Sequence, residues 1–597
     1  MKTRLTFEEL LSLSSGARLG LLEGLYEHSD WIVEHAWQRA TPRSAVHLLW
    51  LCTQALEDAG REAKLQLICA HPELAGKAMV AGTLTQASTQ EQSSAGLTHC
   101  SPEEFAHLQN LNQRYAEKFG WPFILAVKGP RGTGLSRQVI IQTFERRLNQ
   151  SAAQEFDECI RQIHRIAQVR LADRIQVDSS RGVELWDAHE QLAQYTDVEG
   201  TLTALYLQPA HQNTARHLVQ MMQEAGFDDV FTDDVGNVVG RWLGKQPHLP
   251  ALMMGSHYDT VRNAGKYDGR LGILAPIACV KKLNAQGIKP QRTLEMVAFA
   301  EEEGQRFPAT LLASSALTGQ FDPAWLEQTD AQGISLRDAL LACKLNPNAI
   351  DQLKRDPKHY LGFLEIHIEQ GPVLQAMHLP LAVVTSINGA VRLHGSITGT
   401  AAHAGTTPMN LRHDALCALS EWVSRVEAVA HEMSPAVATI GIAEVPMGSI
   451  NVVPGQARFT LDVRAPQDAL RDALLAQLMD ELQNICNKRG VQVLIQETYR
   501  APAAPCNAAL QQVWADAITE TGLPVHRMPS GAGHDAMKMH HLLPQAMLFV
   551  RGENGGISHN PLESTHQDDM QLTLEVLDRV LHRLILNQET RHEPFSH

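Results

Sequence analysis

The spacing of apolar residues divides the chain into a helical first part and a mixed second part. Up to about residue 175, apolar positions recur at helical spacing, as in SAVHLLWLCTQALEDA and QEFDECIRQIHRIAQVRLADRI, and only FILAV at 123–127 suggests a short extended segment. After about 176, β-type runs such as ALMMGSH and TLEMVAFAEEEG alternate with helical segments such as LAPIACVKKLNAQG. This alternation is typical of an α/β unit, in which active groups gather at the carboxyl ends of strands.

A third pattern lies between about 385 and 500. There VRLHGSITGTA, VATIGIAEV and ARFTLDVRA alternate polar and apolar positions with a period of two, and helical segments separate them. We therefore predict an all-α N-terminal domain over 1–175 and an α/β domain built from 176–384 and 501–597. A compact α+β unit, 385–500, is inserted into the second domain.

Composition narrows the class of protein. The 597 residues include 66 acidic and 51 basic side chains, for a formal charge of −15, without a long run of one sign. A nucleic-acid-binding protein would show a basic patch or stripe, so that class is disfavoured. The first residues, MKTRLTFEELLSL, have acids directly after the bases and resemble neither a signal peptide nor a membrane span. The nine cysteines are scattered and form no CxxC motif. They predict reduced thiols in the core of a cytoplasmic protein. We expect no membrane partner.

Residues of the kind that bind metal ions follow several of the predicted strands. They lie in GSHYDT, KYDGRLG, FAEEEG, EIHIEQG and GISHN, and they are His257, Asp268, Glu301, Glu302, Glu303, His367 and His559. Divalent cations need imidazole nitrogens and carboxylate oxygens, and a two-metal site needs a carboxylate that bridges the ions. The set predicts a di-metal hydrolase, although spacing alone leaves ordinary surface histidines and a solvated acidic turn as the alternative.

The residues also suggest a division of roles. We assign His257 and His367 to one ion, Glu303 and His559 to the other, and Asp268 to both. Asp259, two positions after His257, could hold the other imidazole nitrogen. Of two adjacent glutamates at a strand end, one can bind metal while the other, Glu302, serves as general base.

The motifs of the second part resemble the M20 metallopeptidase clan, in its amidase and hydantoinase/carbamoylase branch. The resemblance rests on GSHYDTV, YDGRLG, AEEEG, HIEQGPVL, TAAHAGTTPM, NVVPG, SGAGHDA and GISHNPLE, which occur in that order between about 176 and 590. It implies a catalytic domain with two zinc or manganese ions and an inserted domain that forms a homodimer and closes as a lid. The implied metal ligands are His257, Asp268, Glu303, His367 and His559, with Glu302 as general base.

The same resemblance implies how substrate is held. His403 would stabilise the oxyanion in the neighbouring protomer's site, and the ureido and carboxylate groups would be bound by Gln370, Arg412, Asn451 and Arg464. A carboxylate does favour a bidentate guanidinium. By the residues alone, the two arginines could equally be paired on the surface and Asn451 could be a turn residue.

The helical part resembles 2-oxo-4-hydroxy-4-carboxy-5-ureidoimidazoline (OHCU) decarboxylase over about 1–175, through HPELAGK, STQEQ and KFGWPF. The resemblance implies His71 and Glu91 as the catalytic pair, and Ser88 with Arg170, or Arg165 in another register, as substrate-binding residues. No cofactor is implied, because the conjugated ring of the substrate can accept the electrons that departing CO₂ leaves behind. By itself, HPEL could simply be a helix N-terminus.

Together the two resemblances predict a bifunctional enzyme of purine breakdown. The first half would form (S)-allantoin, and the second would hydrolyse allantoate to ureidoglycine, ammonia and CO₂. Three alternatives keep the second fold and change the substrate to an N-carbamoyl-L-amino acid, ureidopropionate or ureidoglycolate. A fourth makes one half a non-catalytic dimerisation module.

Overall fold

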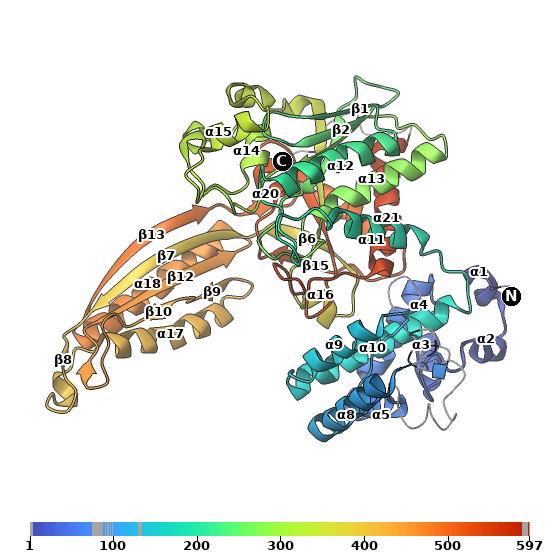
Figure 1. The fold of residues 1–597 in the computed structure, drawn as a ribbon, viewed down its shortest axis with the longest axis horizontal. Coiled ribbons are helices and arrows are strands. Elements are labelled where there is room, and N and C mark those ends of the chain that lie inside the picture. Colours follow the sequence, from blue (N-terminus) through green and yellow to red (C-terminus); the bar gives the residue numbers. More distant parts are fainter. Residues whose placement is uncertain are drawn as a thin grey trace.

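The computed structural model describes residues 4–74, 88, 89, 91, 93, 95, 97, 100–128, 134–587 and 595. In Figure 1 the helical N-terminal unit lies beside a large α/β unit, and a smaller unit projects from the α/β unit on long strands. Within these described residues, no helix combines the length and the apolar character that a membrane crossing requires.

The N-terminal unit is built mainly of helices. Its helices are α1 Phe7–Ser12, α2 Ser15–Leu22, α3 Trp31–Arg39, α4 Ala45–Asp58, α5 Gly60–Ala70, α8 Pro102–Phe119, α9 Arg137–Arg147 and α10 Ala152–Ala172. Short sequence motifs define where several of these helices begin and end. Capping boxes start α8 (Ser101 with Glu104) and α10 (Ser151 with Gln154). Gly120, in the left-handed region, ends α8. α10 packs against α4 and α5 through Phe156, Cys159, Ile160 and Ile163.

A nine-stranded sheet forms the centre of the α/β unit. Its order is β1 Asp229–Thr232, β2 Val238–Trp242, β4 Leu294–Phe299, β3 Ala251–His257, β5 Tyr360–Ile368, β16 Gln545–Val550, β6 Leu381–Ile387 and β14 Ala504–Pro505, with β15 Arg527–Ser530 parallel to β6. The four central strands β4, β3, β5 and β16 are parallel and almost wholly buried. Their carboxyl ends therefore share one edge of the sheet.

Helices cover this sheet. They are α11 Ser180–Leu192, α12 Pro209–Ala225, α13 Arg270–Ala285, α14 Leu312–Thr318, α15 Leu336–Ala342, α16 Val373–Ala376, α19 Ala508–Thr519, α20 Asp535–Met539 and α21 Gln567–Leu581. Short helical turns lie at Pro323–Glu327, Pro347–Leu353, Pro357–His359, Met409–Leu411 and His582–Leu586. The helical first part and this α/β unit agree with the predicted fold classes.

The projecting unit is a five-stranded antiparallel sheet with two helices on one face. Its strands are β7 Gly389–Thr398, β9 Val437–Thr439, β10 Ala443–Glu444, β12 Gln456–Ala465 and β13 Gln492–Ala501, and its helices are α17 Ala415–Glu432 and α18 Asp468–Arg489. Alternate residues of β12 point into a core shared with both helices. At the far end, β8 Ala402–His403 pairs with β11 Val452–Val453 (Figure 1).

The cysteines differ in part from their prediction. All nine are free, but Cys69 and Cys417 are exposed. Core placement was therefore wrong for these two, because one apolar-type residue on a helix does not define which face is buried.

Candidate functional site: a cluster of metal-binding side chains and a buried arginine cavity

The strand ends bring the predicted metal ligands together. His257 is the last residue of β3, the three glutamates follow shortly after β4, and His367 is the penultimate residue of β5. His559 lies in the loop after β16, and Asp268 lies in the loop before α13. Since the central strands are parallel, residues that are far apart in the sequence meet at one sheet edge.

Asp268 lies at the centre of this cluster. Its Oδ1 is 3.5 Å from His257 Nε2 and 3.1 Å from His367 Nε2, while its Oδ2 is 3.2 Å from His559 Nε2. His559 Nε2 is also 3.6 Å from Glu303 Oε1. Asp268 thus presents one oxygen to each of two groups of ligand-type atoms, His257–Asp268–His367 and Asp268–Glu303–His559.

The donor set fits two divalent cations. Ligand atoms around a tetrahedral zinc ion, bonded at 2.0–2.1 Å, lie about 3.3 Å from one another, close to the separations found around Asp268. Burial and the Asp268 carboxylate raise the pKa of Glu303 to about 7. Burial also raises the pKa of Glu302, and the adjacent Glu303 carboxylate adds to this. Cations at the centre would offset this crowding of carboxylates.

The three consecutive glutamates have different surroundings. Glu301 is buried, and its carboxylate accepts hydrogen bonds from the backbone of Gly304 and Leu312, which makes it a loop-holding residue. The amides of Glu302 and Glu303 instead donate to the two oxygens of Asp259, at 3.1 and 3.3 Å. Asp259 Oδ1 also lies 3.4 Å from His257 Nδ1, so this carboxylate links the loops after β3 and β4.

Sequence reasoning assigned no role to Glu563, although it belongs to the quoted GISHNPLE motif. Its buried carboxylate accepts hydrogen bonds from the amides of Tyr267 and Asp268, at 2.9 and 3.1 Å, and from Ser558 Oγ at 2.8 Å. Ser558 Oγ also lies 3.0 Å from Asp268 Oδ2. Glu563 and Ser558 therefore fix the backbone and the carboxylate of the central aspartate. A glutamate four residues after a predicted ligand was the only signal available.

Because Gly269 has no side chain, the loop that carries Asp268 can lie close to the His257 ring. Gly269 has φ +65°, and a Cβ there would lie 2.5 Å from both Cδ2 and Nε2 of the His257 ring. We expect Gly269→Ala to displace that ring and to lower any metal-dependent turnover by about 10²-fold, as a misplacement of roughly 1 Å can do. Gly287→Ala is the matched control, since Gly287 has φ +71° with nothing within 4 Å. Equal turnover of the two variants would show that this contact is unimportant.

A second cluster lies in the helical unit. His71, Ser88, Glu91 and Arg170 line one small cavity, together with apolar residues of 123–127. The Arg170 guanidinium is buried; it donates to Glu91 Oε1 at 2.8 Å and to Ser88 Oγ at 3.3 Å. The structure thus brings together all four residues that the resemblance implied.

The contacts of Arg170 and Arg165 show which of the two arginines lies at this cavity. Arg170 also pairs with the buried Glu27, at 2.8 Å, a residue that sequence reasoning missed. Arg165 instead pairs with Asp568 of the α/β unit and does not line the cavity. Of the two candidate arginines, only Arg170 is at this site.

The ring of His71 has one engaged nitrogen. Nδ1 lies 2.9 Å from the carbonyl oxygen of Leu67, to which it donates, while Nε2 is buried and has no hydrogen-bond partner among the described residues. Burial, with the nearby charge of Arg170, lowers the pKa of His71 to about 4. The neutral ring therefore carries a free lone pair on Nε2 near neutral pH.

Comparison with known proteins identifies a family for each of the two units. The family model of OHCU decarboxylase matches residues 12–172, and that of peptidase family M20/M25/M40 matches residues 253–583, more than half of the chain. The chain belongs to the M20/M25/M40 family. It carries an OHCU decarboxylase domain ahead of the M20 region, so both resemblances are confirmed.

Relatives of the M20 region include proteins with two different activities in their names. N-carbamoyl-L-amino acid amidohydrolase of Geobacillus stearothermophilus is 35% identical over 66% of this chain and 97% of that protein. Allantoate deiminase of Arabidopsis thaliana is 37% identical over 64% of this chain and 78% of that protein. A hydantoinase/carbamoylase family amidase from Burkholderia ambifaria superposes with a TM-score of 0.63 at 34% identity, over 69% of this chain and 98% of that one.

The remaining predicted residues of the M20 region are divided between two places. Gln370 lies in the metal-type cluster, with Nε2 2.9 Å from Asp268 Oδ2. His403, Arg412 and Asn451 lie at the far end of the projecting unit, away from that cluster in the same chain (Figure 1). Arg464, on β12, pairs with Asp462 and donates to the carbonyl of Gly531 at 2.8 Å, where the projecting unit joins the α/β unit.

The tip residues have defined local contacts. His403 is exposed, and its Nδ1 accepts from the amides of Gly405 and Thr406, at 3.1 and 3.2 Å, which leaves Nε2 as the protonated nitrogen. Arg412 donates to the carbonyls of Thr407 and Ala404 within the same loop. His403 Nε2 is therefore a hydrogen-bond donor at the exposed tip.

Proposed function

We propose that this chain is a bifunctional enzyme of purine breakdown. The helical unit would decarboxylate OHCU to (S)-allantoin, and the M20 unit would hydrolyse allantoate to ureidoglycine, ammonia and CO₂. The observation that carries the proposal is the joining, in one chain, of an OHCU decarboxylase domain with an M20 domain whose relatives include allantoate deiminases. The OHCU decarboxylase domain in the same chain makes allantoate the favoured substrate among the ureido acids. We propose that both reactions take place in the cytoplasm.

In the M20 unit, two divalent ions, zinc or manganese, would be held by His257, His367, Asp268, Glu303 and His559. When bound, such ions supply Lewis acidity toward the substrate carbonyl and toward water. Glu302, whose pKa is raised by burial, would take a proton from water and return it to the leaving nitrogen. Gln370 and Arg464 would hold the ureido and carboxylate groups, together with Arg412 and Asn451, which lie at the far tip with His403 and would act in the site of the neighbouring protomer.

In the helical unit, Arg170 and Ser88 would hold the substrate's carboxylate and imidazolone. His71 Nε2 would handle the single proton of the reaction, with Glu91 as its catalytic partner. Orientation and one placed proton suffice without a cofactor, because the substrate ring accepts the electron pair of the broken C–C bond.

A second candidate for the M20 unit is hydrolysis of an N-carbamoyl-L-amino acid, which the Geobacillus relative favours. Turnover of both substrates at saturating metal separates the two candidates. We expect kcat/KM for allantoate to exceed that for N-carbamoyl-L-amino acids by at least about tenfold, the effect of one or two well-placed hydrogen bonds. The reverse order would keep the chemistry and change the substrate.

We further propose that the projecting unit forms a homodimer and acts as a lid. Large apolar side chains are exposed on it, among them Met409, Leu411, Met447, Ile450 and Leu494. Exposed apolar groups in such numbers are typical of an interaction surface. His403, at the tip, would complete the partner's site by donating to the oxyanion from Nε2.

Mixed dimers test this arrangement. Glu302→Gln chains and His403→Ala chains should each release little ammonia alone. After subunit exchange, we expect about a quarter of wild-type activity, because half of the randomly paired dimers are mixed and each mixed dimer keeps one intact site. If the mixture stays as inactive as its parents, His403 acts within its own chain; an active His403→Ala parent would show that His403 has no catalytic role.

A further inference from the structure

The guanidinium of Arg170 already has an acceptor for every N–H group. Its Nε and Nη2 donate to the two carboxylate oxygens of Glu91, at 2.8 and 3.0 Å, and Nη2 also donates to Ser88 Oγ at 3.3 Å. On the other edge, Nη1 donates to the carbonyl oxygen of Gly24 at 3.1 Å and pairs with Glu27 at 2.8 Å. These contacts take up the five N–H groups of a guanidinium. A substrate carboxylate can therefore bind Arg170 only in place of one of these partners.

The two edges of this guanidinium face different surroundings. Glu91 and Ser88, which hold the Nε and Nη2 edge, both line the small cavity, and the side chain of Glu91 is 18% exposed. Glu27, which holds the Nη1 edge, is not among the described residues that line the cavity, and its side chain is 3% exposed. A ligand in the cavity therefore meets the edge that Glu91 holds.

The cavity is too small for a ring that carries a ureido group and a carboxylate. Its volume is about 30 Å³, whereas small-molecule sites begin at roughly 300 Å³. Some of its lining side chains must therefore move when such a ligand binds. Phe123, Ile124 and Val127 are buried core residues. Glu91 is only partly buried and can withdraw toward solvent with the least loss of apolar contact.

The charges at Arg170 favour the exchange of one carboxylate for another over the addition of a third. One guanidinium lies between the carboxylates of Glu27 and Glu91, and burial keeps the nearby His71 ring neutral by lowering its pKa. A substrate carboxylate that bound beside both glutamates would add an unpaired anion to a largely buried site, which is costly. If Glu91 moves toward solvent as the substrate binds, Arg170 keeps two anionic partners.

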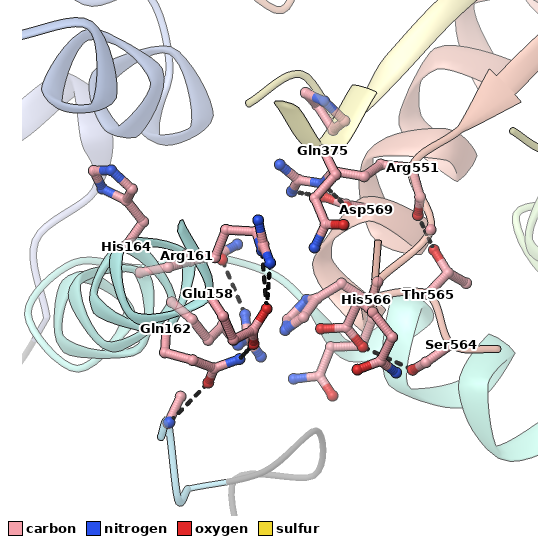
Figure 2. Close-up of a pocket in the computed structure, with 18 of the residues that line it drawn as sticks. Glu158, Arg161, Gln162, His164, Gln375, Arg551, Ser564, Thr565, His566 and Asp569 are labelled. Carbon is pink, nitrogen blue, oxygen red and sulfur yellow. Dashed lines mark hydrogen bonds and ion pairs between the residues drawn. The ribbon is translucent and has the colours of Figure 1, made fainter. Parts of the chain in front are cut away.

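The other arginines of α10 do not offer a second binding place at this cavity. Arg161 and Arg165 line the larger space between the helical unit and the α/β unit. There Arg161 pairs with Glu158, as Figure 2 shows, and Arg165 pairs with Asp568. Among the described residues, Arg170 is the only arginine or lysine that lines the small cavity. The carboxylate of a substrate in this cavity therefore has Arg170 as its cationic partner.

We propose that Glu91 determines the specificity of the helical unit by occupying the place of the substrate's carboxylate. A substrate binds when its own carboxylate replaces that of Glu91 on the Nε and Nη2 edge of Arg170. Glu91 is thereby released from the ion pair and becomes available to act with His71. This inference deepens the decarboxylation proposed above and rests on it.

The same exchange accounts for release of the product. Loss of CO₂ breaks a C–C bond, the electron pair stays on the ring, and the ring takes up one proton, so neutral (S)-allantoin remains. Allantoin has no carboxylate to keep Glu91 away from Arg170. Glu91 pairs with the guanidinium again, and the cavity returns to its small volume.

Calorimetric titration of the full-length protein tests the exchange, with hydantoin-5-acetate as an anionic probe and its neutral amide as the comparison. The test variant is Glu91→Asp, which keeps the charge but draws the carboxylate back from Arg170. It should bind the anionic probe at least about tenfold more tightly than the wild type, because one charge-assisted hydrogen bond no longer has to be broken. Its affinity for the amide should change by less than about threefold. Glu91→Gln, which weakens the ion pair at constant side-chain length, should also bind the anionic probe more tightly.

The matched control is Glu27→Asp, which makes the same change on the opposite edge of Arg170 and leaves Glu91 in place. Binding to the M20 unit is common to all the proteins, so differences between them report the helical unit. Equal tightening in Glu91→Asp and Glu27→Asp, unchanged affinity in both Glu91 variants, or no binding of the anionic probe to any of the proteins would overturn the exchange.

Failure of the proposed decarboxylation is measured separately, as the absence of CO₂ release from OHCU by the wild-type protein, and it leaves the affinities readable. Normal decarboxylation with unchanged affinities would refute only the exchange.

Discussion

Replacing Glu302 by glutamine is expected to lower ammonia release from allantoate by about 10³-fold, within the 10²–10⁴-fold range of general acid–base catalysis. Glutamine keeps the size of the side chain and cannot take a proton. The predicted metal ligands around Asp268 are untouched, so bound metal should remain at the wild-type level. The two quantities to measure are kcat for ammonia release and metal content per chain.

The control for this change is Glu224→Gln, on the exposed surface of α12. It alters the same functional group far from the cluster and should retain full activity. Decarboxylation by the helical unit should be unaffected in both variants. If Glu302→Gln kept more than about a tenth of wild-type ammonia release, Glu302 would not be the general base.

Replacing His71 by glutamine is expected to lower formation of (S)-allantoin from OHCU by about 10²–10⁴-fold, with ammonia release unchanged. The free Nε2 lone pair of His71 is the only proton-accepting group of its ring, and glutamine lacks an equivalent base. The reaction can be measured by the circular dichroism of its chiral product, (S)-allantoin. His35→Gln, an exposed histidine on α3, is the matched control.

The pH profile adds an independent check on His71. Its pKa is lowered to about 4 because burial disfavours the charged ring. The neutral, proton-accepting form therefore predominates above that value. We expect the wild-type decarboxylation rate to stay level from pH 8 to about pH 5 and to fall only below it. A fall centred near pH 6.5 would contradict a buried His71, and unchanged decarboxylation in His71→Gln would exclude it as the proton carrier.

The fold classes of the helical and α/β units could be predicted from the sequence. The ligand-type residues could be singled out because each ends a strand or occupies a distinctive motif, and their roles stay predictions. Sequence reasoning assigned roles to Glu302 and Glu303 but none to Glu301. The role of Glu301 depends on its contact with the amides of Gly304 and Leu312, which only the folded loop creates.

Long-range contacts explain what else was missed. Arg165 and Arg170 are five positions apart on one helix, so they point to different faces, and periodicity does not say which face meets the cavity. Glu27 and Glu563 act on residues that are far away in the sequence, Arg170 and Asp268. Contacts between the helical unit and the α/β unit, such as that of Arg165 with Asp568, depend on how the two units pack, for which no local pattern exists.

The most direct test of the account is a titration of metal-stripped protein with Mn²⁺ or Zn²⁺ while ammonia release from allantoate is followed. Two groups of ligand atoms that share Asp268 predict no release without metal and a maximum at two equivalents per chain. Ammonia release that is independent of added metal, or no cleavage of allantoate at any metal level, would contradict the assignment of a di-metal allantoate hydrolase.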